Sequence, residues 1–477
     1  MGFFEGSEVP VDDKRRARTD TLGTLRDGAL DHVGGSMSTL FHRLLSTRLA
    51  WVGAIFMAPI VSSLAEGSSG AEQTLRPRIT LSADALGGMC ELGETVVFTA
   101  EVRNSSKDKL NGELRWELET VAFDAKELKP TKLQLKGKET KTFQYELEMK
   151  VSGFVKVSCT VAERGEREVT RSKRVGCDPT GVLSELTREE DFDEFWAQSI
   201  KELAEVEPEY ELIEVTQEEG ADGELYELIM RSHGDVRVRG WLQVPKTEGP
   251  HSALLRVPGY TQNMRPVGDT GGAVILSLNI RGHGNSTDDV PGHPRDFWVR
   301  GLDDKETYYY RGAYLDCVRA VDYLSSRDDV DQDRIAVWGG SQGGGLSFAT
   351  AALDQRIDLC VADIPWLCDW ENYLTLAGKT DDEEIQAWLD AKKSRTPEST
   401  LKILSYFDTM NMADRIQCPT LMGVGLQDSV CPPSTSFATF NRITAERDFR
   451  IYEESGHGLD APHYQWILGE MATRLGS

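Results

Sequence analysis

The sequence predicts an α/β protein in which a small all-β domain precedes a larger domain with a mostly parallel sheet. Three observations lead to this prediction. Short alternating runs separated by turn residues fill positions 76–177, and from residue 254 onward apolar strand-like runs alternate with helix-length segments. A chain of 477 residues is also too long for one ordinary core, so we expect two folded domains.

The first 75 residues form a leader of different composition. Residues 1–36 are polar, with a basic stretch at 14–18 and no apolar periodicity. After Met37, basic residues at 43 and 48 precede an apolar run over 49–61 and the segment Ser63-Leu64-Ala65, which has small residues at the usual recognition positions. This pattern is typical of a secretory signal peptide over 37–65, and the run is too short for a membrane anchor of about 20 residues. We therefore expect an exported protein, periplasmic or secreted, with its start at Met1 or Met37 left open.

Residues 76–177 are expected to form a small immunoglobulin-like sandwich. Alternating runs lie at 79–81, 96–102, 114–118, 143–147 and 154–157, with turn residues such as Asn111-Gly112 between them. Such a domain either packs against its neighbour or binds polysaccharide. The runs form no obvious aromatic platform for a sugar, so the packing role is favoured. A linker over 178–190 leads to the second domain, 191–477, which begins with an acidic helix start at 191–196.

Composition narrows the partners and cofactors. The 53 basic and 78 acidic residues leave a net charge of −25, which repels nucleic acid and anionic lipid surfaces. We expect no nucleic-acid partner and, after signal cleavage, no membrane partner. The eight cysteines form no C-x-x-C pair or zinc-site spacing, so no metal and no other cofactor is expected. Export would allow a disulfide between two of Cys90, Cys159 and Cys177, with the pairing left open.

The most specific motif is Gly-Gly-Ser-Gln-Gly at 339–343, directly after a predicted strand over 335–338. It matches the G-x-S-x-G turn that holds a serine at the carboxyl edge of a sheet. A helix over 344–353 then points its amino-terminal dipole at the charge that develops during acyl transfer. The motif predicts an α/β-hydrolase domain with Ser341 as nucleophile.

A serine hydroxyl needs a base, and in this fold the chain order is serine, acid, histidine. We expect His457 to be the base, because it follows the strand 449–452 on a loop, and His463 to be a surface residue of the next helix. Asp428, which closely follows the strand 420–424, is expected to orient His457. Other nearby acids are expected at the solvated surface: Asp408, Asp414 and Asp460.

Two backbone amides are expected to bind the oxyanion. One belongs to Gln342, next to the nucleophile, and the other to Tyr260, which follows the strand 254–257. Trp366 follows the strand 359–362. We expect it either to line a small acyl pocket near Tyr260 or to pack in the core.

A series of motifs carries a family resemblance. They are Arg281-Gly282-His283-Gly284, Arg-Gly-Leu-Asp-Asp at 300–304, Tyr-Tyr-Tyr-Arg at 308–311, the serine motif at 339–345, Asp-Ile-Pro-Trp-Leu-Cys at 363–368, the segment 423–428 and Cys-Pro-Pro-Ser-Thr at 431–435. In this order they resemble the acetyl xylan esterase and cephalosporin-C deacetylase family, carbohydrate esterase family seven, over about 191–477. The resemblance implies deacetylation of short xylo-oligosaccharides and related small acetyl esters. It also implies the Ser341, Asp428 and His457 triad, the Tyr260 and Gln342 oxyanion hole, and a homo-oligomer, commonly a hexamer.

The chain departs from the family pattern at three places. His283 replaces a glutamine, Gly458 replaces a glutamate, and the segment 285–300, expected over the mouth of the active site, is short. Two alternatives stay open. A peptidase of the prolyl oligopeptidase type is disfavoured because no long propeller with repeats is present, and a non-catalytic polysaccharide-binding protein is disfavoured by the complete Ser/Asp/His set. The natural sugar, the oligomeric state and the role of the sandwich are not indicated.

Overall fold

A computed structural model describes residues 77–125, 128–163, 168–217, 223–376 and 379–476. The described residues together form one structural unit. The predicted leader and signal peptide lie outside them, so cleavage and export stay predictions. Among the described helices, none is both long and apolar enough to cross a membrane.

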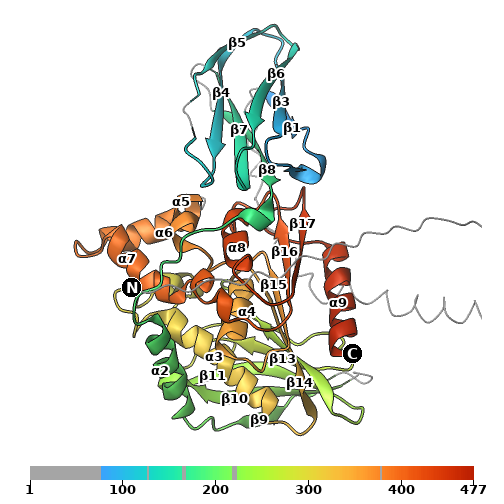
Figure 1. Cartoon of the computed structure of the whole chain (residues 1–477), viewed down its shortest axis with the longest axis vertical. Helices are drawn as coiled ribbons and strands as arrows, with labels where there is room; N and C mark the ends of the chain where they lie inside the picture. The colour runs from blue at the N-terminus through green and yellow to red at the C-terminus, as the bar shows by residue number, and fades with distance from the viewer. Residues whose placement is uncertain (1–76, 126–127, 164–167, 218–222, 377–378, 477) are drawn as a thin grey trace, which may run out of the picture. The chain divides into compact units, whose positions relative to one another are not determined.

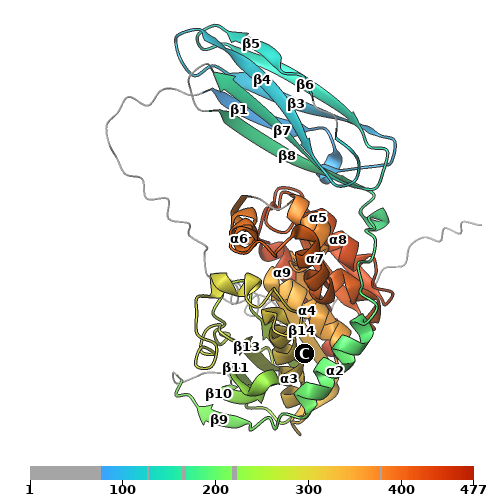
Figure 2. The same ribbon diagram turned by 90° about the vertical axis from the view of Figure 1, so that its left-hand side faces the viewer.

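The amino-terminal strands pair into two small sheets, which confirms the predicted all-β region (Figure 2). The first sheet has the order β1 (Arg78–Ala83), β3 (Thr95–Arg103), β6 (Thr140–Glu148). The second has the order β2 (Met89–Cys90), β8 (Val169–Cys177), β7 (Gly153–Glu163), β4 (Leu110–Glu119), β5 (Thr131–Leu135). Every second residue of β3 from Val96 to Val102 is buried, so its apolar side chains pack in the core that both sheets share.

The second part is built on a nine-stranded sheet with the order β17-β16-β15-β14-β12-β13-β11-β10-β9. Its strands are β9 (Glu211–Glu214), β10 (Gly223–Ser232), β11 (Val236–Pro245), β12 (His251–Val257), β13 (Val274–Asn279), β14 (Val330–Gly340), β15 (Leu359–Asp363), β16 (Thr420–Gly425) and β17 (Arg447–Tyr452). Strands β12 to β17 are parallel, and they contain the predicted runs at 254–257, 335–338, 359–362, 420–424 and 449–452. The antiparallel strands β9, β10 and β11 form one edge.

Helices cover both faces of this sheet (Figure 1). On one face, α3 (Tyr309–Ser325) and α4 (Gln342–Leu353) pack on the central strands, and Leu255 and Val337 point into that core. On the other face, α9 (Ala461–Leu475) packs against the alternate residues Leu254, Trp338 and Val361. All seven residues of β12 are buried, as expected for a parallel strand covered on both sides.

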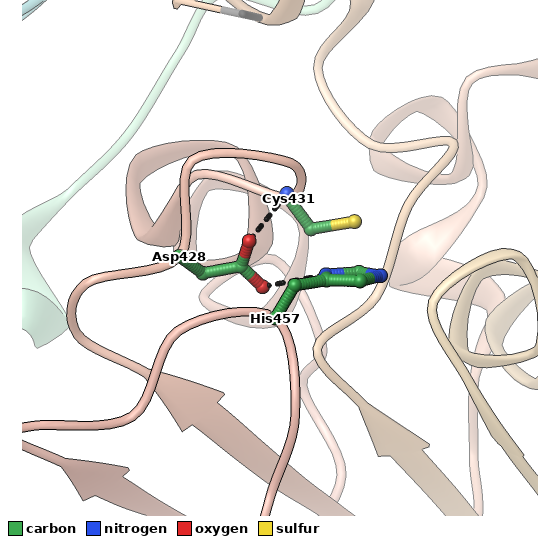
Figure 3. A group of neighbouring side chains, drawn as sticks. All are labelled: Asp428, Cys431 and His457. Atoms are coloured by element: carbon green, nitrogen blue, oxygen red, sulfur yellow. Dashed lines mark hydrogen bonds and ion pairs between the residues drawn. The ribbon is translucent and has the colours of Figure 1, made fainter. Parts of the chain in front are cut away.

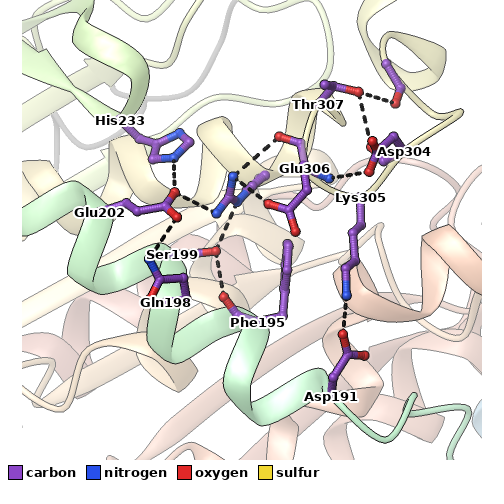
Figure 4. Close-up of polar contacts among 12 residues, drawn as sticks. Asp191, Phe195, Gln198, Ser199, Glu202, His233, Asp304, Lys305, Glu306 and Thr307 are labelled. Carbon is purple, nitrogen blue, oxygen red and sulfur yellow. Dashed lines mark hydrogen bonds and ion pairs between the residues drawn. The ribbon is translucent and has the colours of Figure 1, made fainter.

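The predicted acidic helix start is confirmed as α2 (Phe192–Ala204), which packs on α3. Arg311 of α3 is buried, and its guanidinium contacts the Glu202 carboxylate at 2.8 Å and the Ser199 hydroxyl at 3.0 Å. Glu202 also lies 3.2 Å from His233, and Lys305 bonds to Asp191 at the helix start (Figure 4). These contacts fix α2 against the domain that it opens.

Three helices lie between β15 and β16, and a fourth follows β16. They are α5 (Trp370–Leu376), α6 (Lys379–Asp390), α7 (Pro397–Leu404) and α8 (Pro433–Phe440). Short 3-10 turns complete the described elements: Leu86–Gly88, Pro179–Gly181, His233–Asp235, Pro294–Val299, Ser405–Phe407, Thr409–Asn411 and Ala413–Arg415. The Thr396 hydroxyl accepts the Ser399 amide and caps α7.

All eight cysteines are buried free thiols. The disulfide that export would allow between two of the three amino-terminal cysteines is therefore not formed in the structure. Cys90 and Cys177 are partners in the parallel register of β2 and β8, and burial raises the pKa of the Cys90 thiol to about 12. Both thiols stay protonated at neutral pH and act as small core side chains.

Candidate active site

Ser341 occupies the sharp turn between β14 and α4, as the motif predicts. Its φ of 60° lies in the left-handed region, where a non-glycine residue is strained and must be held by its surroundings. The Ser341 amide donates to the Asp363 carbonyl at 2.9 Å, and the Ser341 carbonyl accepts the amides of Gly344 at 2.9 Å and Trp366 at 2.9 Å. The ends of β14 and β15 therefore hold the serine in place.

His457 and Asp428 complete a chain of hydrogen bonds with this serine. His457 Nε2 lies 3.1 Å from Ser341 Oγ, and His457 Nδ1 lies 2.9 Å from Asp428 Oδ2. The other carboxylate oxygen accepts the amides of Val430 at 2.8 Å and Cys431 at 2.9 Å (Figure 3). Asp428 is fully buried, whereas a quarter of the His457 side chain is exposed. The structure thus brings the three predicted residues together at the carboxyl ends of β14, β16 and β17.

The two predicted oxyanion amides lie at neighbouring strand ends. Gln342 is the first residue of α4, where an amide has no partner within its own helix. Its side chain is fixed, because Oε1 accepts the Tyr310 hydroxyl at 2.6 Å and Nε2 donates to the Pro258 carbonyl at 3.3 Å. Burial raises the pKa of Tyr310 well above its ordinary value, so the phenol stays a donor. Tyr260 follows β12, and its hydroxyl donates to the Arg295 carbonyl.

Trp366 belongs to the core and also contacts the residues around the site. It is 6% exposed and packs in the large cluster beneath the sheet edge. Its ring centroid lies 5.2 Å from that of Tyr260 and 6.2 Å from that of Tyr310. The core role is therefore confirmed, and the pocket role stays a prediction.

Two residues expected at the surface are buried instead. His463 is fully buried, and both of its ring nitrogens have partners. Its Nε2 lies 2.7 Å from Asp363 Oδ1, and its Nδ1 lies 3.0 Å from the Tyr452 hydroxyl. Asp408 is 1% exposed because its carboxylate accepts three backbone amides, those of Asp369, Trp370 and Met410. Burial raises the pKa of Asp408 to about 7. The expectation is confirmed for Asp414 and Asp460, which are exposed.

Cys431 is a site residue that sequence reasoning did not assign. Its Sγ lies 4.0 Å from Ser341 Oγ, and the side chain is 1% exposed. Within the described part of the chain, Asp428, Cys431 and His457 are the one group with donor atoms close enough for a shared metal ion, within 4.8 Å of one another. The His457 and Asp428 atoms already bond to each other. The signal in the sequence was the position of Cys431 three residues after Asp428, on the loop that enters α8.

Comparisons with known proteins place this geometry in a family. The family model described as acetyl xylan esterase (AXE1) matches residues 183–468. The acetyl esterase Axe7A of Xylanibacter ruminicola is 30% identical over 325 residues, which cover 65% of this chain and 72% of that protein.

Two solved structures of acetyl xylan esterases are similar to this chain in sequence and in fold. An acetyl xylan esterase from Paenibacillus sp. R4 is 32% identical with a TM-score of 0.58, over 62% of this chain and 98% of that one. Acetyl xylan esterase 1 from Thermoanaerobacterium sp. JW/SL YS485 is 32% identical with a TM-score of 0.57, over 63% of this chain and 98% of that one. With an α/β-hydrolase fold, the serine turn and more than half of its length matched, this chain belongs to the acetyl xylan esterase family of carboxylic ester hydrolases.

Proposed function

We propose that the protein removes acetyl groups from acetylated carbohydrates, xylan or xylo-oligosaccharides, through an acetyl-enzyme formed on Ser341. The observation that carries this proposal is the continuous hydrogen-bond chain from Ser341 Oγ through His457 to the buried Asp428. Family membership supports an ester hydrolase over the two alternatives, a peptidase of the prolyl oligopeptidase type and a non-catalytic polysaccharide-binding protein.

The first half-reaction acylates the serine. His457 Nε2 accepts the hydroxyl proton as Ser341 Oγ bonds to the acetyl carbonyl carbon, and Asp428 stabilises the imidazolium. The carbonyl oxygen becomes an oxyanion, which the amides of Gln342 and Tyr260 bind. When the tetrahedral intermediate collapses, the bond to the sugar oxygen breaks, and the imidazolium gives its proton to that oxygen. A free sugar hydroxyl leaves.

The second half-reaction releases acetate. His457 takes a proton from a water molecule, whose oxygen bonds to the acetyl carbon, and the same amides bind the new oxyanion. Collapse breaks the bond to Ser341 Oγ, which recovers its proton from the imidazolium. The exposed quarter of the His457 side chain is consistent with water reaching the base in this step.

The test is acetate release by the protein and by Ser341→Ala. We expect the parent to release acetate from acetylated xylan and acetylated xylo-oligosaccharides but not to cleave a proline-containing peptide. Ser341→Ala should lower turnover by about five to six orders of magnitude, as loss of a triad nucleophile does. Ser394→Ala, which changes an exposed serine, serves as the matched control. Turnover of Ser341→Ala within about tenfold of the parent would contradict the proposal.

A small acyl pocket forms the second part of the proposal. The Tyr260 and Trp366 ring centroids lie 5.2 Å apart, and the Trp366 amide donates to the Ser341 carbonyl, so we infer that these two rings bound a small acyl pocket. A longer chain would displace the carbonyl from its two donors, and a misplacement near 1 Å costs about a hundredfold in rate. We expect kcat/KM to fall by about that factor from p-nitrophenyl acetate to the octanoate. Equal or rising values along acetate, butyrate and octanoate would instead indicate a general esterase with an open pocket.

A further inference from the structure

The loop that carries Asp428 is held from behind by a strand of the β-sandwich. This loop follows β16 and includes the backbone carbonyl oxygens of Leu426 and Asp428. Both accept hydrogen bonds from Arg174 Nη1 of β8, the first at 3.2 Å. The Arg174 side chain is 4% exposed, so water has little access to these carbonyls, and Arg174 is the donor that satisfies them.

Gln427 joins the same loop to the main chain of β8. Its Oε1 accepts the Arg174 amide at 2.8 Å, and its Nε2 donates to the Arg174 carbonyl at 3.1 Å. The same Nε2 donates to the Glu453 carbonyl at 2.9 Å. The residue before Asp428 therefore bonds both to the sandwich and to the segment that leads to His457.

The histidine loop has its own contact with β8. Lys173 Nζ lies 3.2 Å from the Glu453 carboxylate and 2.6 Å from the Glu454 carboxylate. Only 12% of the Lys173 side chain is exposed. Two consecutive residues of one sandwich strand thus contact the two loops that carry Asp428 and His457.

We propose that Arg174 is a positioning residue for Asp428, and that the sandwich acts as a support for the acid and histidine loops. This inference rests on the proposed role of Asp428 in orienting His457. A buried carboxylate can orient an imidazole only while its own backbone is fixed, and here one guanidinium fixes two carbonyls on either side of Gln427.

The test compares Arg174→Met with Arg174→Lys and with the matched control Arg171→Met. Arg171 lies on the same strand but is exposed, and its guanidinium donates to the adjacent Thr170 carbonyl. We expect Arg174→Met to lower kcat for p-nitrophenyl acetate by about tenfold to a hundredfold, with KM changed by less than about threefold. Arg174→Lys keeps the charge and one donor and should recover part of kcat, while Arg171→Met should match the parent.

Two further measurements keep the outcomes distinct. The proton between His457 Nδ1 and Asp428 should give a far-downfield NMR resonance, which can be recorded without substrate. We expect this resonance to weaken in Arg174→Met and to stay as in the parent in Arg171→Met. If Arg174→Met does not fold, Gln427→Leu tests the same support from the other side. Parent-like kcat in folded Arg174→Met, or in Gln427→Leu when only that variant folds, overturns the inference alone. A parent protein that neither hydrolyses acetyl esters nor reacts at Ser341 with a fluorophosphonate counts against the proposed function instead.

Discussion

Both carboxylate oxygens of Asp428 are hydrogen-bonded within the site. Its Oδ1 accepts two amides of its own loop and its Oδ2 faces His457 Nδ1, so both oxygens are used and none faces solvent. In the proposed mechanism the carboxylate therefore orients His457, and the proton passes from Ser341 through His457 to the leaving sugar oxygen.

Asp428→Asn should lower kcat by about four orders of magnitude, because an amide nitrogen facing Nδ1 favours the wrong tautomer of His457. The loop should stay folded, since the remaining amide oxygen can accept the amides of Val430 and Cys431. The measurement is kcat for p-nitrophenyl acetate together with the melting temperature. Asp460→Asn is the control, because Asp460 is exposed and lies three residues after the base. A larger loss in Asp460→Asn would show that the acid was assigned wrongly.

The burial of two polar residues, Asp408 and His463, could not be predicted from the sequence pattern. Asp408 lies in a stretch without strand or helix periodicity, and two of the three backbone amides that its carboxylate accepts, those of Asp369 and Trp370, come from a distant segment. His463 looks like a surface position of an amphipathic helix, and its burial comes from Asp363 at the end of a different strand. Partners this far away in the chain leave no local pattern.

At the scale of elements, the serine turn depends on close contact between α4 and the loop after β15. The Gly345 amide donates to the Ser341 carbonyl at 3.2 Å. A Cβ added at Gly345 would lie 2.1 Å from the Trp366 carbonyl oxygen and 2.9 Å from Leu367 Cβ. Neither neighbour is a flexible chain end, so the backbone itself would have to move.

Gly345→Ala should destabilise the protein by about 1–3 kcal/mol through overpacking and lower kcat by about a hundredfold by shifting the serine. Gly469→Ala in α9 is the control, because its Cβ meets no atom within 4 Å. That change should raise stability by about 0.5–1 kcal/mol, as expected when alanine replaces glycine in a helix. Denaturant unfolding and kcat measure both effects, and parent-like values for Gly345→Ala would mean that the turn tolerates a side chain.

The strands were predictable to the extent that they are apolar. The inner parallel strands β12, β13, β15 and β16 are buried along their whole length and stand out as apolar runs, whereas the edge strand β17 is partly exposed. The strands β8 and β11 mix charged and apolar residues, with Arg171 and Arg174 in one and Arg237 and Arg239 in the other. Arg174 therefore looked like one more solvated charge, and its contact with the acid loop could not be foreseen.

For the molecule as a whole, the pH dependence of stability should carry a contribution from His283. This residue is fully buried between Phe297 and Tyr309, and burial lowers its pKa to about 4. In the unfolded chain a histidine titrates near 6.5. Between these two pH values the unfolded state binds more protons, so stability falls as the pH is lowered, by up to about 3 kcal/mol from this group.

His283→Gln should remove this contribution, because glutamine does not titrate. Glutamine is also the residue of the family pattern at this position. We expect the difference in unfolding free energy between variant and parent to shift in favour of the variant as the pH is lowered from 7 to 4. Denaturant unfolding at several pH values measures it, and comparing the two proteins cancels the carboxylates that titrate in both. A difference that does not change with pH would show that His283 titrates alike in both states.

The order of strands in the main sheet has a consequence for how activity arises. Ser341 follows the inner strand β14, whereas His457 follows β17, one of the two edge strands of that sheet. An edge strand pairs with one neighbour only, so fewer contacts hold it than hold an inner strand, and we expect it to open at a lower free energy than the core. During refolding, fluorescence from the tryptophans around Trp366 reports packing of the core, while recovered turnover reports arrival of the edge. We therefore expect turnover to recover later during refolding than the tryptophan fluorescence does.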